Sequence, residues 1–361
     1  MKLKKILLQI SIAPVLMAAL GAAALDFTIT GSTAFRSIAV DRTKSLFDSP
    51  GPTTYGDGTA TAPGTFSGTM SNQAPSLGSQ VVNMRLSFSG SGTGMQAVDQ
   101  GTPVPTADPN GTNANMTPDI AFSDIFPESA DPSLNGSDFN QVIVGVIPFE
   151  FVCNNTLAGV TNITREQALL LLSDSGIQFG LPAMPASYLG QTGPNSTNVV
   201  WLTGRTADSG TRITVEKNVG SSSSEVLWAF VGGNFVATNG MTSGGLERAT
   251  IANGTNAIGY LGLADAANIA ASAFPIQYEG VKATVANVQS GQYALWGYEH
   301  VVNKVSTLSS AKLAVQAALL SAVTNSGYQN TNTIYTASFA DLANMKVNRG
   351  TDGGAIKSNN F

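Results

Sequence analysis

The sequence is poor in the residues that most enzymes and metal sites need, with one cysteine and one histidine, Cys153 and His300. A single cysteine cannot form an intramolecular disulfide, and Cys153 follows the apolar stretch 142–152, so we expect a buried hydrophobic side chain. One histidine and no Gly-x-Ser-x-Gly turn argue against a Ser-His-acid hydrolase, and we expect His300 to be structural. Because His/Cys clusters and calcium-loop spacing are also missing, we expect no metal site, no cofactor and no enzymatic activity.

Charged residues are also scarce, at 11% of the chain. The chain has 18 lysines and arginines and 23 acidic residues; without Lys2, Lys4 and Lys5 near its start, 15 basic residues face 23 acidic ones, a net charge of −8. This balance, with no basic stripe, excludes nucleic acid as a partner. Because the overall field repels anions, any anion site has to be built from local donors.

One long apolar run is present, and it lies at the start of the chain. Residues 6–19 are almost wholly apolar, follow the three lysines, and precede the small residues 21–24 that a signal peptidase needs. We interpret residues 1–24 as a signal peptide, which predicts a periplasmic or secreted protein. A retained membrane anchor is the alternative, although the run is short for a bilayer span. No later stretch is apolar enough to cross a membrane, so we expect the mature chain not to be membrane-embedded.

The mature chain repeats one local pattern three times: a strand, a turn of small residues, and a helix. Alternation of apolar residues predicts each strand, and helical spacing predicts each helix. This order predicts an α/β fold with mainly parallel sheets flanked by helices. The predicted strands and helices are 26–30 and 34–47, 81–89 and 95–100, and 198–203 and 212–218.

Other stretches have a different character. Segments 49–80 and 101–118 are rich in Gly, Pro, Ser, Thr and Asn, which predicts surface loops or small hairpins, with partial disorder of 49–80 as an alternative. Residues 161–176 are predicted to form an amphipathic helix that Thr164 and Gln167 cap. Residues 310–325 are predicted to form an alanine-rich helix.

The three turns share one property that favours anion binding. A helix N-terminus carries unpaired N–H groups and a partial positive charge, and glycine or serine there lets an anion approach. Arg205, four residues before Ser209, can add a fork of charged donors, although a surface ion pair with Asp208 is the alternative. Asp124 ends the apolar strand 119–123, where open α/β sheets bind ligands. A carboxylate there can accept a hydrogen bond from a protonated oxyanion, and it repels a fully deprotonated one.

Four segments carry a resemblance to a known family: 29–33 (Ile-Thr-Gly-Ser-Thr), 90–94 (Gly-Ser-Gly-Thr-Gly), 119–124 (Asp-Ile-Ala-Phe-Ser-Asp) and 205–211 (Arg-Thr-Ala-Asp-Ser-Gly-Thr). In this order and spacing, the chain resembles the periplasmic phosphate-binding proteins of phosphate-specific ABC transporters, in the type II periplasmic-binding-protein superfamily. The resemblance covers nearly all of the mature chain. It implies a two-lobed fold, with one lobe formed by 25–147 plus 260–361 and the other by 148–259.

The resemblance also implies a ligand, a partner and a set of site residues. It implies that inorganic phosphate binds between the lobes, that Asp124 accepts the proton of the phosphate, and that an ABC-transporter permease is the partner. The chain departs from the family at Asp208, which stands one position later than the usual acidic residue, and at 49–80 and 296–300. A surface or matrix protein that reuses the fold without transport is the alternative. The implied site residues are Ser32, Thr33, Ser91, Asp124, Arg205, Ser209, Gly210 and Thr211.

Overall fold

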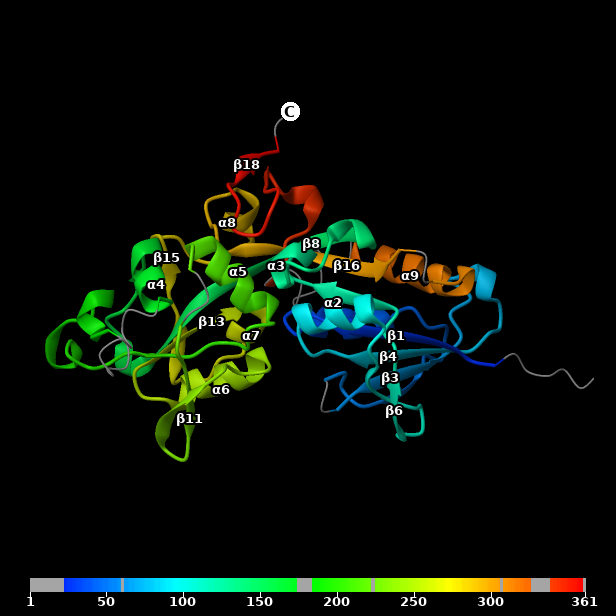
Figure 1. Cartoon of the computed structure of the whole chain (residues 1–361), viewed down its shortest axis with the longest axis horizontal. Helices are drawn as coiled ribbons and strands as arrows, with labels where there is room; N and C mark the ends of the chain where they lie inside the picture. The colour runs from blue at the N-terminus through cyan, green and yellow to red at the C-terminus, as the bar shows by residue number, and fades with distance from the viewer. Residues whose placement is uncertain are drawn as a thin grey trace, which may run out of the picture.

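The computed structural model describes residues 23–59, 62–173, 184–221, 225–305, 308–325 and 338–359, so almost all of the predicted signal peptide lies outside the described residues. Figure 1 shows two groups of strands and helices side by side, joined by the long strands β8 (Phe139–Asn154) and β16 (Trp296–Lys304). Within the described residues, none of the helices has the length and apolar character that a membrane span requires.

One large sheet runs through both lobes. Its parallel pairs are β1 (Leu25–Gly31) with β4 (Val82–Ser87), β1 with β7 (Ile120–Ser123), and β10 (Trp201–Leu202) with β13 (Ala257–Gly262), and its other pairs are antiparallel. The α/β fold is confirmed, but the sheet is mixed where the sequence predicted mainly parallel strands. The reason is that β8 and β16 cross between the lobes in opposite directions and so pair antiparallel. The strand order is β10 (Trp201–Leu202), β13 (Ala257–Gly262), β8, β16, β7 (Ile120–Ser123), β1 (Leu25–Gly31), β4 (Val82–Ser87), β3 (Gly64–Gly68) and β2 (Thr53–Tyr55), with β14 (Ala273–Pro275) also on β8.

Helices cover both faces of the first-lobe sheet. Successive residues of a strand point to opposite faces. Phe122 of β7 therefore packs in the large core that includes residues of α1 (Arg36–Lys44) and α9 (Ser310–Val323), whereas its neighbour Ala121 packs with Met95 of α2 (Ser91–Gln100). The second predicted helix thus starts four residues earlier than expected, directly at the small-residue turn.

The second lobe is built in the same way. Ile258 of β13 faces the core that holds Val215 of α5 (Gly210–Val219), and Leu261 faces Ile251 of α6 on the opposite side. Cys153 is fully buried in this lobe with a free thiol, as expected. Its helices are α4 (Arg165–Leu171), α5, α6 (Gly244–Asn253), α7 (Leu263–Ala266) and α8 (Val285–Gln289).

The predicted capping box at the start of α4 is confirmed. The backbone N–H of Gln167 donates to the hydroxyl of Thr164 over 3.2 Å, and the backbone N–H of Thr164 donates to the side-chain oxygen of Gln167 over 2.8 Å. The remaining short elements are α3 (Pro127–Ala130), the pair β9 (Asn162–Ile163) and β15 (Gln277–Tyr278), the hairpin β11 (Leu227–Val231) and β12 (Asn234–Thr238), and the pair β17 (Val347–Asn348) and β18 (Lys357–Ser358).

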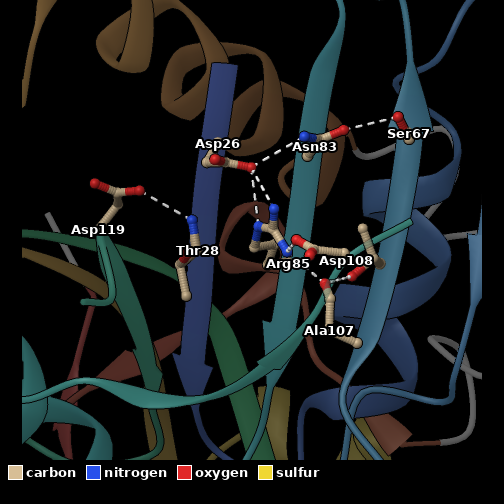
Figure 2. A network of polar contacts seen from close by, with 9 residues as sticks. Asp26, Thr28, Ser67, Asn83, Arg85, Ala107, Asp108 and Asp119 are labelled. Carbon is tan, nitrogen blue, oxygen red and sulfur yellow. Dashed lines mark hydrogen bonds and ion pairs between the residues drawn. The ribbon is translucent and has the colours of Figure 1, made fainter. Parts of the chain in front are cut away.

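The two polar segments of the first lobe form hairpins. Segment 49–80 contributes β2 and β3, and segment 101–118 forms β5 (Val104–Ala107) and β6 (Asn113–Met116). Figure 2 shows how the second hairpin is held: Arg85 of β4 pairs with Asp26 of β1 and with Asp108 beside β5, each over 2.8 Å. Because the guanidinium is only 4% exposed, this network fixes a polar hairpin against the sheet.

The strand pairing bears on where the lobes divide. After β13, strand β14 still pairs with the C-terminal half of β8, and β15 pairs with β9 of the second lobe. The chain returns to the first lobe along β16, which pairs with β7. The expected boundary at residue 260 stays a prediction, and these pairings favour a boundary at β16.

Candidate functional site

The turns after three parallel strands meet at one edge of the first-lobe sheet. Strand β1 lies between β4 and β7, with Thr30 beside Ser87 and Gly31 beside Phe122. Gly31 has a φ of +106°, and a Cβ there would lie 2.0 Å from the carbonyl oxygen of Phe122. Glycine is therefore required for the first turn to pass this close to β7.

The side chains that follow these strands contact one another. The hydroxyl of Ser32 donates to Oδ1 of Asp124, and the backbone N–H of Asp124 donates to Oγ of Ser91 over 3.2 Å. All three residues are at most 2% exposed. Ser32 and Asp124, which are 92 positions apart, thus belong to one buried polar cluster.

The second lobe completes this cluster from the other side. Nη2 of Arg205 donates to Oγ1 of Thr33 over 2.9 Å. A Cβ on Gly210 would lie 2.4 Å from Oγ of Ser91 and 2.7 Å from Oδ2 of Asp124, so the backbone at the start of α5 touches the first lobe. Five of the eight predicted residues therefore meet across the lobes, and a sixth, Ser32, contacts Asp124 within the first lobe. The other two, Ser209 and Thr211, flank Gly210 and are buried.

Backbone carbonyls hold Arg205 in place. Nε donates to the carbonyl of Met241 over 3.0 Å and Nη2 to that of Thr242 over 3.1 Å, and the residue is 2% exposed. The alternative of a surface ion pair with Asp208 is wrong for this structure, because Asp208 lies against α2 instead. Its carboxylate accepts from the hydroxyl of Thr93, and its carbonyl accepts from the N–H of Gly92 over 2.9 Å.

This position of Asp208 leads to a prediction for Thr93→Val. The Thr93–Asp208 hydrogen bond joins the two lobes and exists only while they touch, so its loss should speed ligand release and leave association almost unchanged. A hydrogen bond to a charged group contributes about 1.5–3 kcal/mol, and partial exposure of Asp208 reduces this, so we expect roughly tenfold faster dissociation of the phosphate ligand that the sequence resemblance implies. Stopped-flow displacement measures the rate. Thr117→Val, on the exposed surface, is the control, and equal rates for both variants would contradict the prediction.

Two helix N-termini point their first turns at the cluster. Helices α2 and α5 are ten residues long, and neither has a side-chain cap at its N-terminus. The hydroxyl of Ser209, at the N-cap position of α5, is therefore not used by its own helix. Unpaired N–H groups and the helix dipole favour negative charge at both positions.

Burial raises the pKa values of acidic groups near Arg205. Burial raises the pKa of Asp124, although hydrogen bonds with Glu299 and Ser32 and the charge of Arg205 oppose the rise. Burial likewise raises the pKa of Asp265, again opposed first by Arg205. The site thus combines the buried cation Arg205 with two carboxyl groups whose ionised form burial disfavours and Arg205 favours.

Glu247 leads to a pH-dependent prediction. Burial raises its pKa to about 8, whereas the unfolded chain releases this proton near pH 4.5. The folded state therefore holds more protons between these values, and this group lowers stability as the pH rises from about 4.5 to 8. Gln at this position keeps an acceptor for the N–H of Tyr260, 3.0 Å away, and has no proton to lose.

Glu247→Gln is expected to raise the free energy of unfolding at pH 7 by about 2–3 kcal/mol, with almost no gain at pH 4. Urea unfolding at pH 4, 7 and 8.5 measures the difference. The exposed Glu166→Gln is the control and should show no such trend. A gain for Glu247→Gln that does not change with pH would contradict the linkage.

Sequence reasoning missed three contributors to this site. The carbonyls of Met241 and Thr242 hold Arg205, and nothing in the residue types of positions 241 and 242 indicates this role. From the sequence, Glu299 stands out only as part of segment 296–300, in which the chain departs from the phosphate-binding family. An acidic residue in a run of apolar and aromatic residues was a usable indication, because such a residue is rarely buried unless it has a partner.

No protein-family model matches the chain, and no curated protein sequence matches it. Among solved structures, it is similar to a protein from Clostridium perfringens described as a phosphate ABC transporter substrate-binding protein with bound phosphate. The TM-score is 0.58 and the identity 14%, over 88% of this chain and 99% of that one. An ABC-type phosphate transport receptor from Vibrio cholerae has a TM-score of 0.48 and 17% identity, over 81% of this chain and 93% of that one. At this identity the likeness concerns the fold, and the chain therefore has the two-lobed α/β fold of the Clostridium perfringens substrate-binding protein.

Proposed function

We propose that the protein is a solute-binding protein, not an enzyme, and that it captures inorganic phosphate between its lobes. The observation that carries the proposal is the convergence of Arg205 from one lobe with three turns from the other. Arg205 is buried and reaches Thr33, and Gly210 lies against Ser91 and Asp124. A planar guanidinium and two helix N-termini are the donors that an oxyanion needs in a dehydrated site.

Asp124 narrows the class of oxyanion. A carboxylate accepts hydrogen bonds, so it favours a ligand oxygen that carries a proton and repels a bare one. Phosphate carries at least one proton at neutral pH, whereas sulfate carries none. The Clostridium perfringens protein with the same fold is described with bound phosphate, which supports the same ligand here.

The proposed cycle depends on movement of the lobes about β8 and β16. Phosphate enters the open form, the lobes close, and contacts such as Arg205 with Thr33 and Asp208 with Thr93 then form. The predicted signal peptide places this cycle in the periplasm or outside the cell. We infer that the closed form delivers its ligand to an ABC-transporter permease.

Calorimetric titration of the full-length mature protein tests the ligand. The protein is first stripped of phosphate by unfolding and dialysis, then refolded. We expect saturable heat with phosphate and with arsenate, and little or none with sulfate at equal concentration. If neither phosphate nor arsenate gives measurable heat, the proposed function is wrong.

A further inference from the structure

Strand β16 passes directly beside Asp124. His300 pairs with Ser123, the residue before Asp124, and a Cβ on Gly297 would lie 2.5 Å from the carbonyl oxygen of Asp124. Glu299 lies between these two positions and is fully buried. Its carboxyl group lies close to that of Asp124, and each of the two groups shifts the pKa of the other.

Two ionised carboxylates this close repel each other, and neither can donate a hydrogen bond to the other, so we expect one of them to hold a proton. Among the described residues, neither carboxyl oxygen of Glu299 has a hydrogen-bond donor of good geometry. Asp124, in contrast, accepts from the hydroxyl of Ser32 and faces the positive charge of Arg205. The negative charge is therefore better stabilised on Asp124, and the proton belongs on Glu299.

The shift in the pKa of Glu299 agrees with a proton on this residue. Burial, followed by the negative charge of Asp124, raises the pKa well above the usual range of a glutamate, and the backbone of Ser123 opposes this. Burial also lowers the pKa of His300 to about 4, so this ring is neutral at physiological pH and adds no charge.

The neighbouring elements supply no charge that changes this assignment. Residues of β8 and α5 next to this part of β16 are Gly145, paired with Glu299, and Thr214, which lies close to Gly297. The titratable groups around the pair are Arg205 across the site, Tyr298 and His300 on either side of Glu299, and the ion pair of Lys304 with Asp99 of α2 over 3.2 Å at the far end of β16. Two more lie near its other end: Arg349 donates to the carbonyl of Trp296 over 3.1 Å, and Asp352 accepts from the N–H of Phe126 over 2.8 Å.

We propose that Glu299 is a specificity-determining residue: it stays protonated and donates a hydrogen bond to Asp124, so that Asp124 remains a carboxylate that accepts a hydrogen bond from the protonated oxygen of the bound anion. Glu299 does not touch the ligand and acts through Asp124 alone. Without the hydrogen bond from Glu299, burial favours the protonated form of Asp124. A protonated Asp124 no longer repels oxyanions that carry no proton. This inference rests on the proposed function of the site.

Two substitutions at position 299 distinguish a neutral hydrogen-bond donor from an ionised carboxylate. Glu299→Gln keeps a neutral donor of similar size, and Glu299→Leu removes it. We expect Glu299→Gln to keep the affinity for phosphate and the preference for phosphate over sulfate within about threefold. We expect Glu299→Leu to lower the phosphate affinity and the preference at least tenfold. Competition binding with both anions between pH 5 and 8.5 measures both quantities.

Either of two results overturns the inference. If Glu299→Gln loses preference as strongly as Glu299→Leu, residue 299 acts as an ionised carboxylate; if Glu299→Leu binds like the natural protein, it has no role in selection. Glu150→Gln is the matched control. This glutamate is also buried in a strand that joins the lobes, and burial raises its pKa to about 7, but it lies outside the site. Its substitution should leave the affinities for phosphate and for sulfate unchanged.

A spectroscopic measurement keeps the inference testable if Glu299→Leu does not fold. The infrared spectrum of the natural protein minus that of Glu299→Gln, both at pH 8, should show the carbonyl band of a protonated carboxyl group. The bands of the other buried acids are present in both spectra and cancel. Absence of this band overturns the inference. The same measurement separates the two proposals: a protein that shows the band but gives no heat with phosphate refutes the proposed function and leaves the shared proton standing.

Discussion

Replacement of Arg205 by alanine is expected to lower the affinity for phosphate by about 100- to 10,000-fold. The guanidinium is buried between the lobes, and its positive charge acts on Asp124. Two charge-assisted hydrogen bonds contribute about 1.5–3 kcal/mol each, which gives this range. Calorimetric titration with phosphate measures the loss.

Two further variants control for effects on folding and on general charge. Arg205→Lys keeps the charge and loses the fork, so its affinity should lie between those of the natural protein and Arg205→Ala. Arg248→Ala removes a more exposed arginine of the same lobe, one that lies 3.9 Å from Asp265, and should change the affinity less than threefold. If Arg205→Ala binds phosphate within tenfold of the natural protein while remaining folded by circular dichroism, Arg205 is not the ligand anchor.

Asp124→Asn is expected to weaken the exclusion of sulfate by roughly 100-fold, about 2.7 kcal/mol. The carboxylate repels a bare oxyanion, whereas the amide can donate to it, so the substitution removes a penalty and adds a hydrogen bond. Competition of sulfate against labelled phosphate at pH 8 measures the preference. At this pH phosphate carries one proton and sulfate none.

The pH dependence of the natural protein gives the same test without a substitution. Burial raises the pKa of Asp124, so on acidification it takes up a proton at a higher pH than an ordinary aspartate does. Exclusion of sulfate should therefore weaken as the pH falls, and Asp124→Asn should remove this trend. Asp265→Asn is the control, because burial also raises the pKa of this carboxyl and Arg205 also acts on it. A preference that is unchanged in Asp124→Asn would refute the role of Asp124 in detecting the proton.

The sequence alone was sufficient to predict the local units of this protein. The apolar alternation of β1 and β4, the apolar run of β7 and the polar residues that follow these strands depend on neighbours in the chain. The capping box of α4 is likewise a matter of positions three residues apart. For the same reason, Ser32, Ser91 and Asp124 could be predicted as candidate site residues, since each one follows closely after the end of its own strand.

Only the tertiary structure decided how these units act on one another. Asp208 contacts α2 of the other lobe instead of holding Arg205, and carbonyls of residues 241 and 242 hold Arg205. Glu299 meets Asp124 because β16 pairs with β7 in a register that brings His300 beside Ser123. The register of β16 and the contacts between the lobes depend on packing between segments more than a hundred residues apart in the sequence. Local sequence patterns carry no information about contacts between such distant segments. The residue types that can bind an anion were thus readable from the sequence, whereas the partners that set their charge and position were determined by the fold.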